Sequence, residues 1–84
     1  MADREPHMQS ARVVVEVLAG VIPDRPDEEH TRRWVLTSEQ WHGVEDSEKG
    51  ALLAEINGRA QGYAGWLMLQ PERLNWVRVD WLWL

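Results

Sequence analysis

The last eleven residues of the chain carry large apolar side chains at both alternating positions of a strand. Residues 74–84 read LNWVRVDWLWL. Alternation places Val77, Val79, Trp81 and Trp83 on one face and Trp76, Arg78, Asp80, Leu82 and Leu84 on the other. A single helix of three or four turns covers one face of a small sheet only. We therefore expect part of the other face to stay exposed unless loops or another chain cover it.

The length of the chain limits the size of its core. Its 84 residues correspond to one domain, and a chain this short buries about 60% of the surface that its unfolded form exposes. Apolar residues make up 44% of the sequence, as in ordinary globular proteins. We expect a single folded domain over residues 1–84, with a polar N-terminal segment at residues 1–11 and an acidic loop at residues 23–31.

The chain contains no cysteine, which removes disulfides, thiolate nucleophiles and thiolate metal sites together. Residues 1–11 lack the apolar core of a signal peptide. The longest apolar stretch, residues 13–22, is interrupted by Glu16 and has about half the length of a membrane span. These features predict a cytoplasmic protein that does not contact a membrane.

Two strands and a helix are indicated in the first two thirds of the chain. Residues 12–18 are rich in β-branched side chains, which favours a strand that can extend to Ile22, and residues 32–36 form a second strand paired with it. Thr37 and Gln40 have the spacing of a capping box at a helix start. We expect this helix to be interrupted at Gly43, to restart with Ser47 as its N-cap, and to end at residues 57–58.

The remaining residues predict a C-terminal hairpin. Residues 63–69 and 74–84 are apolar runs that flank Gln70, Pro71, Glu72 and Arg73, and proline at the second position suits a type I turn. The resulting order is β-β-α-β-β. It predicts an α+β fold: a small two-layer sandwich with a four-stranded antiparallel sheet and one helical layer.

The charge of the chain is concentrated in its middle. Residues 24–55 hold nine acids against four bases and account for the whole excess of the net charge of −5. An acidic field repels phosphate backbones and attracts basic surfaces. We therefore expect a protein partner with a basic surface and no direct binding of nucleic acid. The candidate acidic contacts form two groups: Asp24, Asp27, Glu28 and Glu29, and then Glu45, Asp46 and Glu48.

The second acidic group also has a structural explanation, because carboxylates at a helix start are favoured by the macrodipole. The candidate apolar contacts lie on the last strand. Phenylalanine is absent, so most of the six tryptophans are expected to build the core. Tryptophan is also common among binding hot spots. Trp76 is our choice for an exposed or interface residue, together with Leu82 and Leu84 on its face.

The sequence contains no pattern typical of catalysis. His7, His30 and His42 have neither the spacing of a zinc site nor that of a triad. The acids around His30 offer oxygen ligands to a hard cation, but the glycine and the ligand spacing of a calcium loop are missing. Arginines beside Trp34 are a weak signal for nucleic acid in an acidic protein. We therefore predict no enzyme activity, no cofactor and no metal.

The leading hypothesis is a non-enzymatic protein that binds and masks a basic surface of a partner, which can itself be a nucleic-acid-binding surface. In size, acidity and lack of cysteine the chain resembles small phage-encoded inhibitors of bacterial defence, the anti-CRISPR proteins among them. Several of those proteins present carboxylates where their target expects phosphates, as nucleic-acid mimics. This resemblance assigns a role to no residue. Two alternatives stay open: a homodimeric structural or assembly protein, and an antitoxin or adaptor subunit of a cognate basic protein.

Overall fold

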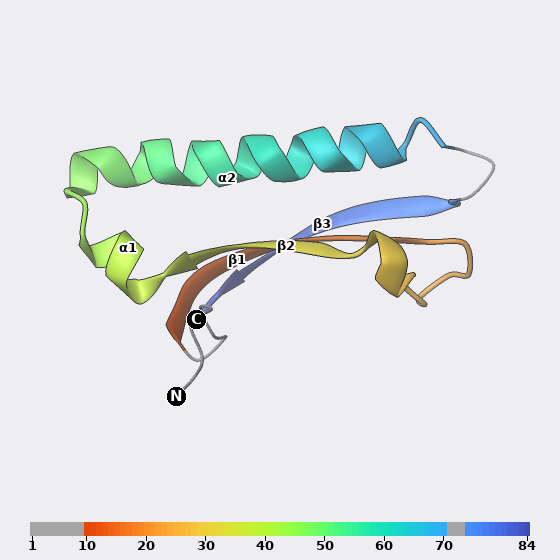
Figure 1. Cartoon of the computed structure of the whole chain (residues 1–84), viewed down its shortest axis with the longest axis horizontal. Coiled ribbons are helices and arrows are strands. Elements are labelled where there is room, and N and C mark those ends of the chain that lie inside the picture. Colours follow the sequence, from red (N-terminus) through yellow and green to blue (C-terminus); the bar gives the residue numbers. More distant parts are fainter. Residues whose placement is uncertain (1–9, 71–73) are drawn as a thin grey trace.

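The computed structural model describes residues 10–70 and 74–84. Its elements follow in the order β1 (Ala11–Gly20), a short 3-10 helix η2 (Glu28–His30), β2 (Arg32–Thr37), α1 (Ser38–His42), α2 (Asp46–Leu67) and β3 (Trp76–Trp83). Helix α2 lies along one face of the sheet (Figure 1). No helix within the described ranges is long and apolar enough to cross a membrane.

Over residues 10–70 and 74–84 the sheet has three strands in the order β2-β1-β3, and both pairs are antiparallel. Val15 in the central strand lies opposite Trp34 of β2 and Trp81 of β3, and Glu16 lies opposite Arg33 and Asp80. Residues directly opposite each other point to the same face of a sheet. Val15 packs in one cluster with residues of α2, so the row through Val15 faces α2. The row through Glu16 lies on the face away from α2, which we call the second face.

The core is aliphatic and is centred on β1. Alternate β1 residues pack against a stripe on α2 whose members are spaced by three or four positions, so that they share one face of the helix. The buried cluster consists of Val13, Val15, Val17, Ala19, Leu36, Ile56, Ala60, Ala64, Leu67 and Leu74. Val14 and Leu18 on the second face are buried as well. Strand β1 is thus buried on both faces, and the exposed surface of the sheet belongs mainly to its edge strands.

The predicted capping box at the start of α1 is confirmed. The Gln40 N–H donates to Thr37 Oγ1 at 3.1 Å, and the Thr37 N–H donates to Gln40 Oε1 at 2.9 Å. Helix α1 ends at Gly43, as its position in the sequence predicts. The N-cap of α2 is Glu45 and not Ser47, and it makes no capping hydrogen bond with its side chain.

The α+β class is confirmed, but the predicted four-stranded, two-layer sandwich is not. Residues 63–67, predicted as part of a strand, instead form the last turns of α2, which continues through Asn57 and Gly58. Its buried stripe runs on through Ala60, Ala64 and Leu67, and this burial outweighs a local stop signal at Asn57 and Gly58. The last strand pairs with β1 and not with residues 63–69. The predicted turn includes Pro71, Glu72 and Arg73, which lie outside the described residues, as does most of the predicted N-terminal segment.

Candidate protein-binding surface

The prediction that most tryptophans build the core is correct only in part: Trp34, Trp41 and Trp81 are partly buried and pack against the aliphatic cluster, whereas the other three do not. All six lie in the described ranges and none is fully buried. Trp66 is 55% exposed and Trp83 is 53% exposed, whereas Trp76, our sequence-based choice for an exposed indole, is half-buried. Valine, alanine and leucine fill the space between sheet and helix, so that the indoles are left to line its margins.

Two aromatic groups lie on the α2 side of the sheet, one at each of its two edge strands. Beside β3, Trp83 meets Trp41 edge to face at 5.8 Å between ring centroids, and it stacks on Trp81 at 6.4 Å. Beside β2, Tyr63 meets Trp34 edge to face at 5.9 Å and stacks on Trp66 at 6.0 Å. The second group ties α2 to the loop before β2, because the Tyr63 hydroxyl donates to the His30 carbonyl at 3.0 Å.

Trp76 anchors the loop that follows β1. Its indole lies against Gly20, and its Nε1 donates to the Ile22 carbonyl at 3.0 Å. The neighbouring Asn75 side chain donates to the Val21 carbonyl at 2.8 Å. A shallow cavity of about 350 Å³ lies here, lined by Val21, Pro23, Asp24, Asn75, Trp76 and Arg78. Sequence reasoning did not place Asp24 beside Trp76; the cavity brings these two predicted contact residues together.

The first acidic group lies in this loop and in η2. Asp24, Glu28 and Glu29 are exposed, and none of them forms an ion pair within the described part of the chain. Asp27 has a structural role instead. Its Oδ2 lies 3.3 Å from His30 Nδ1, and its carbonyl accepts from Thr31 Oγ1 at 3.2 Å.

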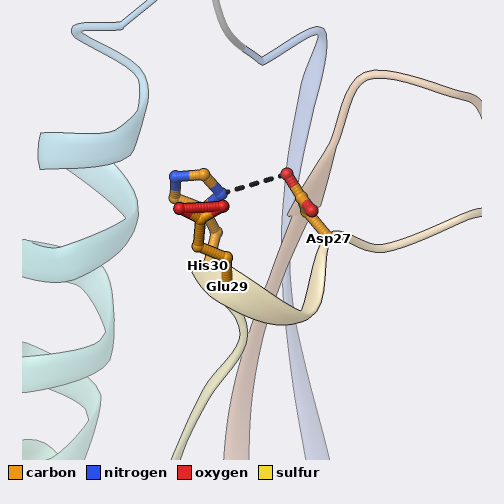
Figure 2. Close-up of side chains that lie close together, drawn as sticks. All are labelled: Asp27, Glu29 and His30. Carbon is orange, nitrogen blue, oxygen red and sulfur yellow. Dashed lines mark hydrogen bonds and ion pairs between the residues drawn. The ribbon is translucent and has the colours of Figure 1, made fainter.

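Asp27, Glu29 and His30 hold their oxygen and nitrogen atoms within 4.8 Å of one another. Figure 2 shows Asp27 and His30 turned toward each other, with the Glu29 carboxylate beside the imidazole. All three side chains come from one short segment, and the contact between Asp27 and His30 is an ordinary hydrogen bond that holds this turn. We assign no metal to this group.

The second acidic group lies at the other end of the molecule. Glu45, Asp46 and Glu48 surround the first turn of α2, where Lys49 Nζ pairs with Asp46 at 3.1 Å. In Figure 1 the start of α2 is next to α1, whereas its last turn and η2 lie at the opposite end. A helix of 22 residues is about 33 Å long. One continuous acidic surface over both groups is therefore not formed.

The predicted apolar contacts are also divided. Trp76, Leu82 and Leu84 follow the alternation of one strand face, and Leu82 and Leu84 are 39% and 52% exposed. Trp76 and Leu82 are six positions apart along the strand, or about 20 Å, and Arg78 and Asp80 lie between them. Leu82 and Leu84 therefore form a small apolar site of their own at the end of β3.

Five exposed apolar side chains that sequence reasoning missed lie in two segments at the same end of the molecule as the first acidic group (Figure 1). They belong to the loop after β1 and to the last turn of α2 and the residues after it: Val21, Ile22, Trp66, Met68 and Leu69. Residues 75 and 76 connect the loop after β1 with the end of α2. They line both of two neighbouring cavities, one of which is also lined by Val21 and the other by Met68. We call this surface, together with Asp24, Glu28 and Glu29, the loop end. The exposure of Trp66, Met68 and Leu69 depends on where α2 ends, which sequence alone did not reveal.

A scan against models of protein families, a search of curated proteins and a search of solved structures gave no match to this chain. A function therefore has to be inferred from the surface of the chain itself.

Proposed function

We propose that the chain is a non-enzymatic protein-binding module whose loop end receives a basic surface of a partner protein. The observation that supports this most is that five exposed apolar side chains, in two segments at one end of the molecule (Figure 1), accompany three carboxylates without an ion pair in the described part. Large exposed apolar patches bordered by polar groups are typical of protein interaction sites.

Electrostatics favour the loop end over the start of α2. A helix carries a partial negative charge at its C-terminus and a partial positive charge at its N-terminus. The C-terminus of α2 lies at the loop end (Figure 1), so its partial charge adds to that of Asp24, Glu28 and Glu29. At the other end, the helix N-terminus and Lys49 partly offset Glu45, Asp46 and Glu48. Arg25 in the same loop offsets one of the three loop carboxylates, so the preference for the loop end rests on the opposite signs of the two helix ends.

In this proposal the carboxylates steer association and the apolar side chains slow dissociation. Masking a basic surface in this way would inhibit a partner that uses the same surface for nucleic acid. In this proposal the protein acts in the cytoplasm, and it has no enzyme activity, no cofactor and no direct contact with nucleic acid.

The test compares two double variants of equal charge change. E28K/E29K should slow association with the partner by about tenfold or more at low ionic strength, with the difference shrinking as salt rises. E45K/E48K reverses the same number of charges at the opposite end and should leave the association rate within about twofold of the original chain. The partner is first captured from an extract of the organism that encodes the chain, at two salt concentrations, and the rates are then measured with purified components.

Equal association rates for both variants, or capture that does not depend on salt, would contradict the proposal. Thermal unfolding of each variant separates a loss of binding from a loss of the fold. The control variant is expected to lose some stability, because Glu45 and Glu48 lie at the positive end of α2.

A further inference from the structure

Within the part of the chain that the structure describes, the outer edge of β3 has backbone groups without a partner strand. The Leu84 N–H donates to the Arg12 carbonyl at 2.9 Å, so the backbone of Leu84 is directed toward β1. Backbone direction alternates along an antiparallel strand. Val77, Val79, Trp81 and Trp83 therefore direct their N–H and C=O groups away from β1. Among the described residues no strand pairs with that side of β3.

The two edges of the sheet differ in what protects them. Strand β2 begins with two exposed arginines and contains no acid, so a second β2 beside it would bring only like charge. Strand β3 contains no proline, and its charges are one arginine and one acid. Leu82 and Trp83 near its end are exposed. Because the two charges of β3 have opposite signs, they do not repel a second β3, and an edge without protection readily pairs with other strands.

We infer that a second copy of this chain pairs with β3 along this edge, antiparallel, with Val79 opposite Val79 of the second copy. The product is a symmetric dimer with one continuous six-stranded sheet. A two-fold axis at Val79 places Arg78 opposite Asp80 of the second copy and Asp80 opposite Arg78 of the second copy. Each dimer thus gains two cross-strand pairs of opposite charge on the second face.

Charge selects this register over its neighbours. The outward-directed backbone groups belong to odd-numbered residues, so each hydrogen-bonded pair must join an odd-numbered residue of one copy to an odd-numbered residue of the other. One β3 can therefore slide along the other only by two residues at a time. One step in one direction places Asp80 opposite Asp80 of the second copy. One step in the other places Arg78 opposite Arg78 of the second copy. Both oppose like charges, which is unfavourable for directly opposite residues.

The same register pairs the apolar residues of the edge. Val77 comes opposite Trp81 of the second copy, and Trp76 comes opposite Leu82 of the second copy. Both are apolar pairs of the aromatic and aliphatic kind that stabilise sheets. Two of the apolar contacts predicted from the sequence, Trp76 and Leu82, then have a second copy as their partner.

The charge pair also relieves an unfavourable contact within one copy. Asp80 lies directly opposite Glu16 across β1 and β3. Within the chain these carboxylates are balanced by Arg33, 2.6 Å from Glu16, and by Arg78, 3.1 Å from Asp80. A dimer would bring a second arginine to each Asp80.

The first experiment is sedimentation equilibrium of the full chain from about 1 to about 100 µM. A monomer–dimer equilibrium is expected. V79P removes an outward N–H at the two-fold axis. A single copy tolerates this change, because the nitrogen of residue 79 faces away from β1, but in the dimer the same nitrogen would have to donate to the second copy. V79P should therefore weaken the dimer by about tenfold or more. V79A is the matched control: it loses similar apolar contact but keeps the N–H, so the dimer should persist.

The second experiment distinguishes pairing between copies from pairing within one copy. R78D and D80R each oppose like charges in a homodimer and should each weaken it by about tenfold. When the two variants are mixed in equal amounts, each aspartate again meets an arginine of the other chain, and a heterodimer should form at concentrations where either variant alone is monomeric. The ion pair within each copy stays broken in the mixture, so it cannot produce this result.

A chain that stays monomeric throughout this range overturns the inference, as does a dimer that V79P leaves unchanged. A dimer that forms without recovery in the R78D and D80R mixture overturns the register. The inference does not depend on the loop end, and E28K/E29K should dimerise as the original chain does.

Discussion

At the scale of single residues, Gly20 and Trp76 fix the path of the loop after β1. A Cβ added at Gly20 would lie 2.5 Å from the Arg25 carbonyl oxygen and 3.2 Å from the Trp76 ring. The carbonyl is backbone and cannot rotate away, so the loop itself would have to move. The loop end therefore depends on a buried glycine that is not among the proposed contact residues.

We expect Gly20→Ala to lower the free energy of unfolding by about 1–3 kcal/mol, the usual cost of overpacking. Urea denaturation followed by circular dichroism measures it. An unchanged midpoint would show that the loop accommodates a methyl group and that its described path is not required.

Trp76→Phe tests the hydrogen bond of the indole separately from its packing. The variant keeps an aromatic ring over Gly20 but loses the Nε1 donor to the Ile22 carbonyl, and we expect a loss of about 1 kcal/mol in the free energy of unfolding. Trp76→Ala should cost more, because it also removes the packing. Equal stabilities for all three chains would place Trp76 outside the fold, as a residue for binding alone.

At the scale of elements, the unexpected length of α2 determines most of the surface. Gly58 and Gly62 have no neighbour within 4 Å of the position that a Cβ would occupy, so they lie in open space on the helix. Glycine inside a helix costs about 0.5–1 kcal/mol relative to alanine.

Gly58→Ala together with Gly62→Ala should therefore raise the free energy of unfolding by about 1–2 kcal/mol, measured as a higher denaturation midpoint. This sign is opposite to that expected for alanine at Gly20. The helix stop and strand predicted from the sequence would give no such gain, since alanine at a helix end or before a strand adds no helical stability. An unchanged or lower midpoint would therefore contradict the continuous helix.

Local signals predicted the start of α1 and all three observed strands, because the capping pair of Thr37 and Gln40 and the valine-rich run of β1 act through near neighbours. They failed at residues 63–67, where a short apolar run suits a buried strand and a buried helix equally. The stop at Asn57 and Gly58 was wrong because burial of Ala60, Ala64 and Leu67 extends the helix. The candidate site could likewise be predicted only in part. The carboxylates can be read from the sequence, but the exposure of Val21, Ile22 and Trp66 depends on how the helix and the loop pack in the fold.

At the scale of the whole molecule, the two proposed interfaces use different parts of the surface. The loop end combines segments from β1 to η2 with the end of α2, whereas the dimer edge runs along β3. Trp76 borders both, since its side chain lies under the loop and its backbone lies in the edge strand. A dimer would carry two loop ends, and a partner with two basic sites would be held more tightly than one site allows if the spacing fits.

The central position of β1 also has a kinetic consequence. Val13 in this strand pairs with Leu36 on one side and with Trp83, seventy positions along the chain, on the other. Pairing over such a separation has to overcome the entropy of closing a long loop before it gains hydrogen bonds or burial. A β1–β2 hairpin can form early, but its valines stay open to water until α2 and β3 arrive. The chain should therefore fold more slowly than a helical bundle of the same size.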